Sequence, residues 1–146
     1  MTSAGVLAAV LLIVTEFSII ASVDVASGSC QVIQDTNPEL ADRCELSGLE
    51  RNGGSFILLA GLTAFMAWGA GVGGSRPAAI ALAVVGVAVL AWSLLVDLPV
   101  TNETGALGRN FEGATAAAEA GLTIEIVAGA LALLAGAIRL LAPARE

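Results

Sequence analysis

The sequence predicts an all-α membrane protein: four transmembrane helices in an antiparallel bundle, with a small disulfide-stapled extracytoplasmic loop. Three observations predict this class. Of the 146 residues, 57% are hydrophobic and only 13% are charged, whereas soluble domains have about 25% charged residues. The apolar residues form four long runs, and a helix needs about 20 of them to cross a bilayer. These runs are apolar on every face, which favours helices over the alternating strands of a membrane barrel.

The four runs define the expected spans and the loops between them. Transmembrane helices are predicted at residues 4–23, 56–72, 78–96 and 122–141. The outer loops are then 24–55 and 97–121, and a tight turn joins the second and third helices, because Gly73, Gly74 and Pro77 favour a turn. The first run is read as a retained helix, since no basic residue precedes it and Glu16 lies inside it. We expect one transmembrane domain over residues 1–146.

Charge predicts the orientation and excludes some partners. Basic residues mark short cytoplasmic segments, and the short turn and the C-terminal end carry Arg76, Arg139 and Arg145. Both termini are therefore predicted to be cytoplasmic, in a multi-pass protein of the plasma membrane. The two outer loops are acidic, whereas nucleic acids and anionic lipid headgroups attract clusters of Lys and Arg. We expect the lipid bilayer as a partner and no nucleic acid.

The two cysteines, Cys30 and Cys44, both lie in the first outer loop. In an oxidising compartment we expect one structural disulfide between them, worth roughly 3 kcal/mol for a loop of this size. A redox-active pair is the alternative, although no C-x-x-C is present and only Arg43 is a basic neighbour. Between the cysteines, Asn37-Pro38-Glu39 predicts the start of a short helix that continues to about Leu46.

Three carboxylates are the candidate functional residues. Glu16 and Glu125 lie inside predicted spans and Asp97 follows the outer end of the third, and ionisable groups in a membrane usually face the bundle interior or a watery cavity. Three interpretations stay open. The carboxyls are structural groups that share protons, they pair with Arg51 or Arg109 of the outer loops, or they bind or relay a cation or a proton.

Small residues share a helical face with each of the two intramembrane glutamates. Residues spaced by three or four positions lie on one face of a helix, and small residues at that spacing mark close helix packing in membranes. The predicted packing residues are Gly5, Ala9, Ala128, Ala132 and Gly136. Both glutamates are therefore expected to point inward and to approach each other.

The chain lacks the residues of common enzyme sites. It has no histidine, no phosphate-binding glycine loop and no nucleophile elbow. We expect no metal, no cofactor and no enzymatic activity.

Two resemblances accompany this interpretation. Four spans with a cysteine pair in a long first outer loop resemble the claudin type of tetraspan, in topology only. Claudins carry a Trp-based motif before the loop cysteines, whereas this chain has Asp24-Val25-Ala26-Ser27-Gly28-Ser29 there, so no function is carried over. The run Asp97-Leu98-Pro99, Thr104-Gly105, Phe111-Glu112-Gly113 and Glu125 is similar to small uncharacterised membrane proteins of high-GC actinobacteria. That resemblance covers the last third of the chain and implies no activity.

The predicted function is a non-enzymatic membrane subunit that acts by self-association or within a larger membrane complex. The alternative is a subunit of a cation or proton channel or transporter that uses the intramembrane carboxylates. A weaker alternative is a membrane thiol oxidoreductase that uses the cysteine pair.

Overall fold

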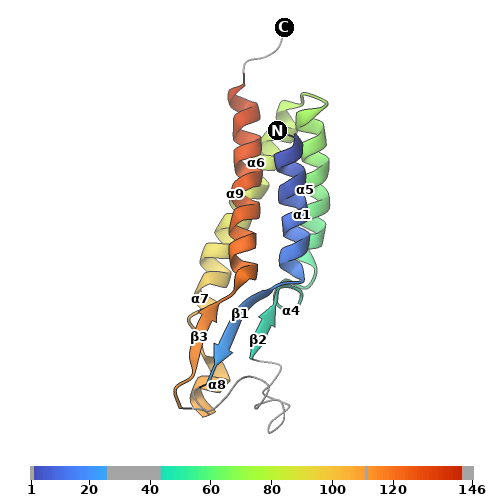
Figure 1. Cartoon of the computed structure of the whole chain (residues 1–146). Coiled ribbons are helices and arrows are strands. Elements are labelled where there is room, and N and C mark those ends of the chain that lie inside the picture. The colour runs from blue at the N-terminus through green and yellow to red at the C-terminus, as the bar shows by residue number, and fades with distance from the viewer. Residues whose placement is uncertain (1, 26–43, 111, 143–146) are drawn as a thin grey trace.

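A long bundle of four helices carries a small three-stranded sheet at one end (Figure 1). The computed structural model describes residues 2–25, 44–110 and 112–142. The bundle helices are α1 (Thr2–Glu16), α5 (Ser55–Gly71), α6 (Arg76–Trp92) and α9 (Ala120–Leu141). α1 begins and α9 ends at the same end of the bundle, beside the α5–α6 turn (Figure 1). The chain is therefore mostly helical, with neighbouring helices antiparallel as predicted.

Glycines set the close contact between α6 and α9. A Cβ atom on Gly86 would lie 2.3 Å from the backbone nitrogen of Leu133, and one on Gly136 would lie 2.6 Å from the carbonyl oxygen of Ala79. No side chain fits at such distances, so the two backbones approach each other directly at these points. α9 also packs against α1, which in turn packs against α5.

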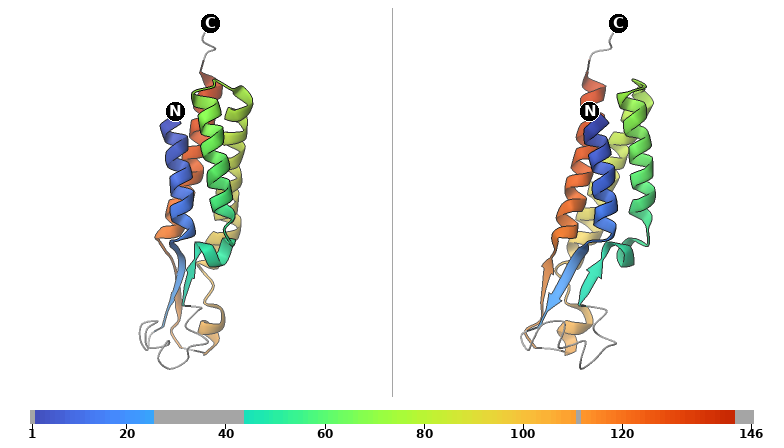
Figure 2. Two further views of the ribbon diagram at one scale, coloured as in Figure 1. Left: turned by 90° about the vertical axis from the view of Figure 1, so that its right-hand side faces the viewer. Right: turned by 45° about the vertical axis from the view of Figure 1, so that its right-hand side comes forward.

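The first helix is shorter than predicted because its last part forms a strand. α1 ends at Glu16, and β1 (Ile19–Asp24) follows it, so the prediction of a helix through residue 23 is wrong beyond residue 16. β1 is the central strand, flanked in antiparallel fashion by β2 (Glu45–Ser47) and β3 (Thr115–Ala118). Its β-branched residues favour a pleated strand. Figure 2 shows the sheet extending beyond the helices, at the end opposite the N-terminus.

The described part of the first outer loop contains a strand and a short helix. The predicted helix through Leu46 is wrong at its end, because Glu45–Ser47 is β2 and the helix α4 (Gly48–Asn52) only then begins. Cys44 is buried in a small apolar cluster with Val23 and Leu107, and it is not a free thiol. Cys30 lies outside the described residues, so its pairing with Cys44 stays a prediction.

The third bundle helix continues through a π-helical segment. α6 runs into the π-helix η1 (Ser93–Asp97) and then into α7 (Leu98–Val100), and α8 (Gly105–Asn110) follows. Pro99 cannot donate a backbone hydrogen bond, and its ring would collide with the carbonyl four residues earlier in a regular helix. The wider π turn accommodates it, and the Leu98 N–H donates to the Ser93 carbonyl. Ser93 and Asp97, the first and last residues of this segment, are both fully buried.

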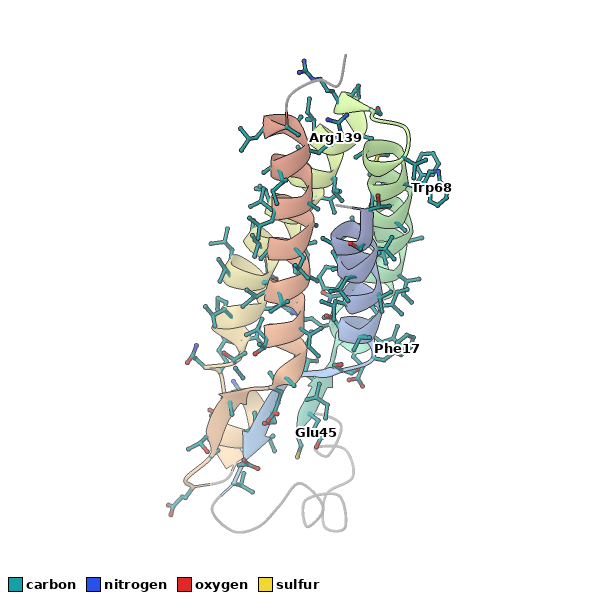
Figure 3. All side chains as sticks on the ribbon, turned by 45° about the horizontal axis from the view of Figure 1, so that its top comes forward. Phe17, Glu45, Trp68 and Arg139 are labelled. Atoms are coloured by element: carbon teal, nitrogen blue, oxygen red, sulfur yellow. The ribbon has the colours of Figure 1, made fainter. Side chains whose placement is uncertain are left out.

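Many large apolar side chains of the bundle helices point outward, although Leu12, Phe56 and Leu82 are buried. Figure 3 shows Trp68 projecting from α5 near one end and Phe17 projecting near the other. The helix core is formed mainly by alanines with a few leucines and valines. Two helical stretches are long and apolar enough to cross a membrane: Arg76–Val100, with mean hydropathy 2.6, and Ala120–Leu141, with mean hydropathy 2.0. α1 and α5 are shorter apolar helices.

Candidate functional site

Three carboxyl groups from three elements are buried at the sheet end of the bundle. Glu16 is the last residue of α1, Asp97 ends η1, and Glu125 lies in the second turn of α9; each is 0% exposed. Isolated buried charges cost several kcal/mol each, so such groups need partners or protons. The sequence predicted that the two glutamates point inward, and the structure places both of them inside the bundle.

The Glu125 carboxyl faces Ser93 and Asp97 of the π-helix. The Ser93 hydroxyl donates to Glu125 Oε1 at 2.6 Å. Glu125 also lies close enough to Asp97 and to Glu16 for their charges to interact. Ser93 and Asp97, four residues apart on one face of the π-helix, thus shape the surroundings of Glu125.

Asp97 is paired with a guanidinium from α4, in the connection between β1 and α5. Arg51 Nε donates to Asp97 Oδ1 at 3.0 Å, and Arg51 Nη2 donates to the Val96 carbonyl at 3.3 Å. Arg51 belongs to α4, so this ion pair ties the loop to the bundle. Arg109, the other predicted partner, is exposed on α8.

Glu16 holds the turn between α4 and α5. Its Oε1 accepts the backbone N–H of Gly54 at 2.5 Å. Gly53 and Gly54 both have positive φ, 59° and 87°, which glycine adopts at little cost. Gly48 at the start of α4 packs directly on the end of α1, because a Cβ there would lie 2.4 Å from the Thr15 carbonyl oxygen. Glu16 therefore accepts a hydrogen bond from the same loop that supplies Arg51.

Several buried polar atoms of this region lack a hydrogen-bond partner among the described residues. They are Glu16 Oε2, Asp97 Oδ2, Glu125 Oε2 and Asn52 Nδ2. Asn52 Oδ1 accepts the indole N–H of Trp92 at 3.1 Å, which fixes the orientation of the amide beside α6. Unpartnered buried polar atoms call for a physical explanation. Within the part of the chain that the structure describes, no group of three or more His, Cys, Asp or Glu side chains is arranged to hold a metal ion.

All of the predicted packing residues lie at helix contacts. The buried set is Gly5, Ala9, Ala128, Ala132 and Gly136. A Cβ on Gly5 would lie 2.5 Å from the Cβ of Ala67, so α1 and α5 approach closely there. Sequence reasoning missed Ser93, Asn52 and Gly54 at the carboxyl cluster. The spacing of four between Ser93 and Asp97 was the available signal for the first of these.

The opposite end of the bundle has its own polar contact, which is partly exposed. Arg139 Nε donates to the Ala70 carbonyl at 3.1 Å, and Arg139 Nη2 donates to the Gly74 carbonyl at 2.9 Å. A cation at the C-terminal end of a helix satisfies free carbonyls and interacts favourably with the helix dipole. Arg139 of α9 thus caps α5 and fixes the α5–α6 turn (Figure 3).

Comparisons of the chain with protein-family models, with curated proteins and with solved structures found no match.

Proposed function

We propose that the chain crosses the membrane four times and acts as a non-enzymatic subunit, by self-association or within a larger membrane complex. The observation that carries this proposal is the distribution of side-chain size around the bundle. Leu58, Phe65 and Leu95 are 79%, 72% and 75% exposed, whereas the helix contacts are made largely by alanine and glycine. Soluble monomers rarely expose large continuous apolar surfaces.

A bilayer explains this distribution physically. Lipid tails are as apolar as leucine, so burying leucine inside the bundle gains little, and helices associate through close backbone contact at small residues instead. The large side chains then remain outside, in contact with lipid. Trp68, 63% exposed near one end of the bundle, suits an interfacial position.

The four helices differ in length, and the sheet compensates for the shortest. α1 has 15 residues, about 22 Å of helix, against a hydrocarbon core of about 30 Å. β1 continues from its end, and both edges of β1 are paired, with β2 and β3. A strand whose backbone N–H and C=O groups are hydrogen-bonded is tolerated near lipid, whereas a strand with unpaired backbone groups is not. The proposal therefore sets the base of the sheet at the outer interface.

The proposed orientation follows from the arginines and the cysteines. Arg76 and Arg139 lie at the end of the bundle with the α5–α6 turn, and this end is proposed to face the cytoplasm, together with both termini. The sheet end, with Cys44, is proposed to face the oxidising side, where the disulfide to Cys30 would form.

The outward face of α5 supports self-association. Leu58, Leu62 and Phe65 are exposed on this face, and a Cβ on Gly61 would meet no atom within 4 Å. Measuring the mass of the protein extracted into detergent and into lipid nanodiscs tests the proposal. We expect an oligomer or a co-purifying partner; a bare monomer in both media would contradict it.

A proton-conducting subunit is the second candidate, favoured by the buried carboxyl cluster. Carboxyls inside a membrane commonly mark proton paths, and three of them meet here. Proton flux into liposomes should then collapse in Glu16→Gln and remain in Glu103→Gln, which alters an exposed residue. Equal flux in the wild type and Glu16→Gln would remove this candidate.

A further inference from the structure

The unpartnered oxygens of Asp97 and Glu125 are explained together. Asp97 Oδ1 is engaged by Arg51, and Glu125 Oε1 is engaged by Ser93. The oxygens left over are Asp97 Oδ2 and Glu125 Oε2, both buried and without a donor among residues 2–25, 44–110 and 112–142. The two carboxyls are nevertheless close neighbours: Ser93, four residues before Asp97 on the π-helix, donates to Glu125, and both carboxyls are 0% exposed. Ionised carboxylates only accept hydrogen bonds, so a hydrogen bond between two of them requires a proton on one.

We infer that Asp97 and Glu125 form a proton-binding site that holds one shared proton, with Glu125 Oε2–H donating to Asp97 Oδ2. One proton satisfies both buried atoms at once. The inference goes beyond the proposed function and does not depend on the number of membrane spans, because it follows from contacts inside the bundle.

The neighbours of each carboxyl decide which one carries the proton. The Arg51 guanidinium lies 3.0 Å from Asp97 and balances its negative charge. No guanidinium of the described residues contacts Glu125, whose charged neighbours are Asp97 and Glu16. Ionising Glu125 would place a second negative charge against one arginine in a site closed to water, at a cost of several kcal/mol. The neutral form of Glu125 therefore fits the site.

The site joins three elements. Asp97 belongs to the π-helix, Glu125 to α9, and Arg51 to α4 of the outer loop. The Arg51 side chain is 31% exposed, so it is the member of the site that reaches the surface. Loss of the proton would leave Asp97 and Glu125 both negatively charged. The two carboxylates would then repel each other and compete for the Arg51 guanidinium. Proton binding is thereby coupled to the contact between the loop and the bundle.

Infrared spectroscopy of the full chain in lipid tests the site directly. At neutral pH we expect a carbonyl stretching band of a buried carboxylic acid that shifts when the exchangeable protons are replaced by deuterium. The band should be lost in Glu125→Gln and kept in Glu103→Gln. Absence of the band in the wild type, or its persistence unchanged in Glu125→Gln, would overturn the inference.

The variants are chosen so that a lost band is not caused by loss of the fold. A glutamine amide has the shape of the neutral acid and donates from the same position, so Glu125→Gln is expected to melt at the wild-type temperature. Asp97→Asn should weaken or abolish the acid band, because Arg51 then lacks its counter-charge and Glu125 ionises beside it. An unchanged band in folded Asp97→Asn would show that Glu125 does not donate to Asp97. A monomeric mass would contradict the proposed oligomer and leave this band in place, so the two failures are distinguishable.

Discussion

Arg51 stabilises the fold through its contact with a fully buried carboxylate, and not as a surface charge. Removing it leaves Asp97 without a cation at 0% exposure, which is costly even though part of the guanidinium reaches solvent. We expect Arg51→Met, which keeps the apolar stem, to lower the free energy of unfolding by about 1–3 kcal/mol, discounted for the partial exposure of Arg51. Thermal unfolding in detergent measures the change.

The control for this prediction is Arg109→Met. Arg109 is exposed on α8, so its replacement should change the melting temperature little. An equal drop in melting temperature in both variants would mean that the net charge of the loops stabilises the fold, and that the ion pair between Arg51 and Asp97 does not.

Glycine substitutions test the close helix contacts separately. Gly86→Ala would place a methyl group 2.3 Å from the Leu133 nitrogen, so α6 and α9 must move apart, at a cost of about 1–3 kcal/mol. Gly61→Ala is the matched control, because its Cβ meets open space and alanine favours a helix by up to about 1 kcal/mol. Unfolding should therefore become easier in the first variant and no easier in the second. Equal melting temperatures would contradict the packing described here.

At this scale the sequence predicted some site residues and missed others for a physical reason. Glu16 and Glu125 could be assigned to the interior, because helical spacing relates each of them to small residues on the same face. Asn52 and Gly54 lie in a loop and reach the site through tertiary contacts, which no local pattern encodes. Ser93 and Asp97 lie in a π turn just before Pro99, and the sequence does not show where the helix widens.

The short helix α4 is held by a capping box. The Ser47 hydroxyl accepts from the Glu50 backbone N–H, and the Glu50 carboxylate accepts from the Ser47 N–H. The backbone hydrogen bond from Ser47, and then its hydroxyl, lower the pKa of Glu50 below its usual 4.5. A carboxylate stabilised in this way contributes stability above pH 4.5 that is lost as the pH falls through its lowered pKa. Protection of the Gly53 N–H from hydrogen exchange should therefore decline in acid.

Glu50→Gln isolates this effect from the buried carboxyls. In that variant the protection of α4 should be lower at neutral pH and should depend less on pH than in the wild type. Ser47→Ala should cost about 0.5–2 kcal/mol of local stability at all pH values. Identical pH profiles for the wild type and Glu50→Gln would show that the capping box is not what titrates.

The end of the first predicted span shows that a hydropathy pattern does not distinguish a helix from a buried strand. The apolar run through Val23 was read as one helix, whereas the chain leaves the helix at Glu16 and forms β1. Short apolar runs suit helices and buried strands alike. The partners that select the strand, β2 and β3, lie 21 or more residues away in the sequence. By contrast, the long runs of α6 and α9 were placed nearly correctly, because such lengths have few alternatives to a helix.

In the molecule as a whole, the two ends of the bundle have different chemistry. One end carries the α5–α6 turn and the Arg139 cap, and the other carries the sheet, the acidic loops and the carboxyl cluster. Between them the outward surface is apolar over the helices (Figure 3). A polar–apolar–polar order along one axis is typical of proteins that cross a bilayer, and the proposed four spans would place the two polar ends on opposite sides of the membrane.

Cysteine labelling of intact cells tests this arrangement. Val72→Cys and Ala142→Cys lie at the turn end, and Asn102→Cys lies at the sheet end. A membrane-impermeant thiol reagent added outside should modify Asn102→Cys alone, and the other two should react only after permeabilisation, because an even number of spans places both termini on one side. Phe65→Cys, exposed in the middle of α5, should resist the reagent in both conditions, since thiolates do not form in hydrocarbon. Modification of Phe65→Cys, or equal reaction of Val72→Cys and Asn102→Cys from outside, would contradict four spans.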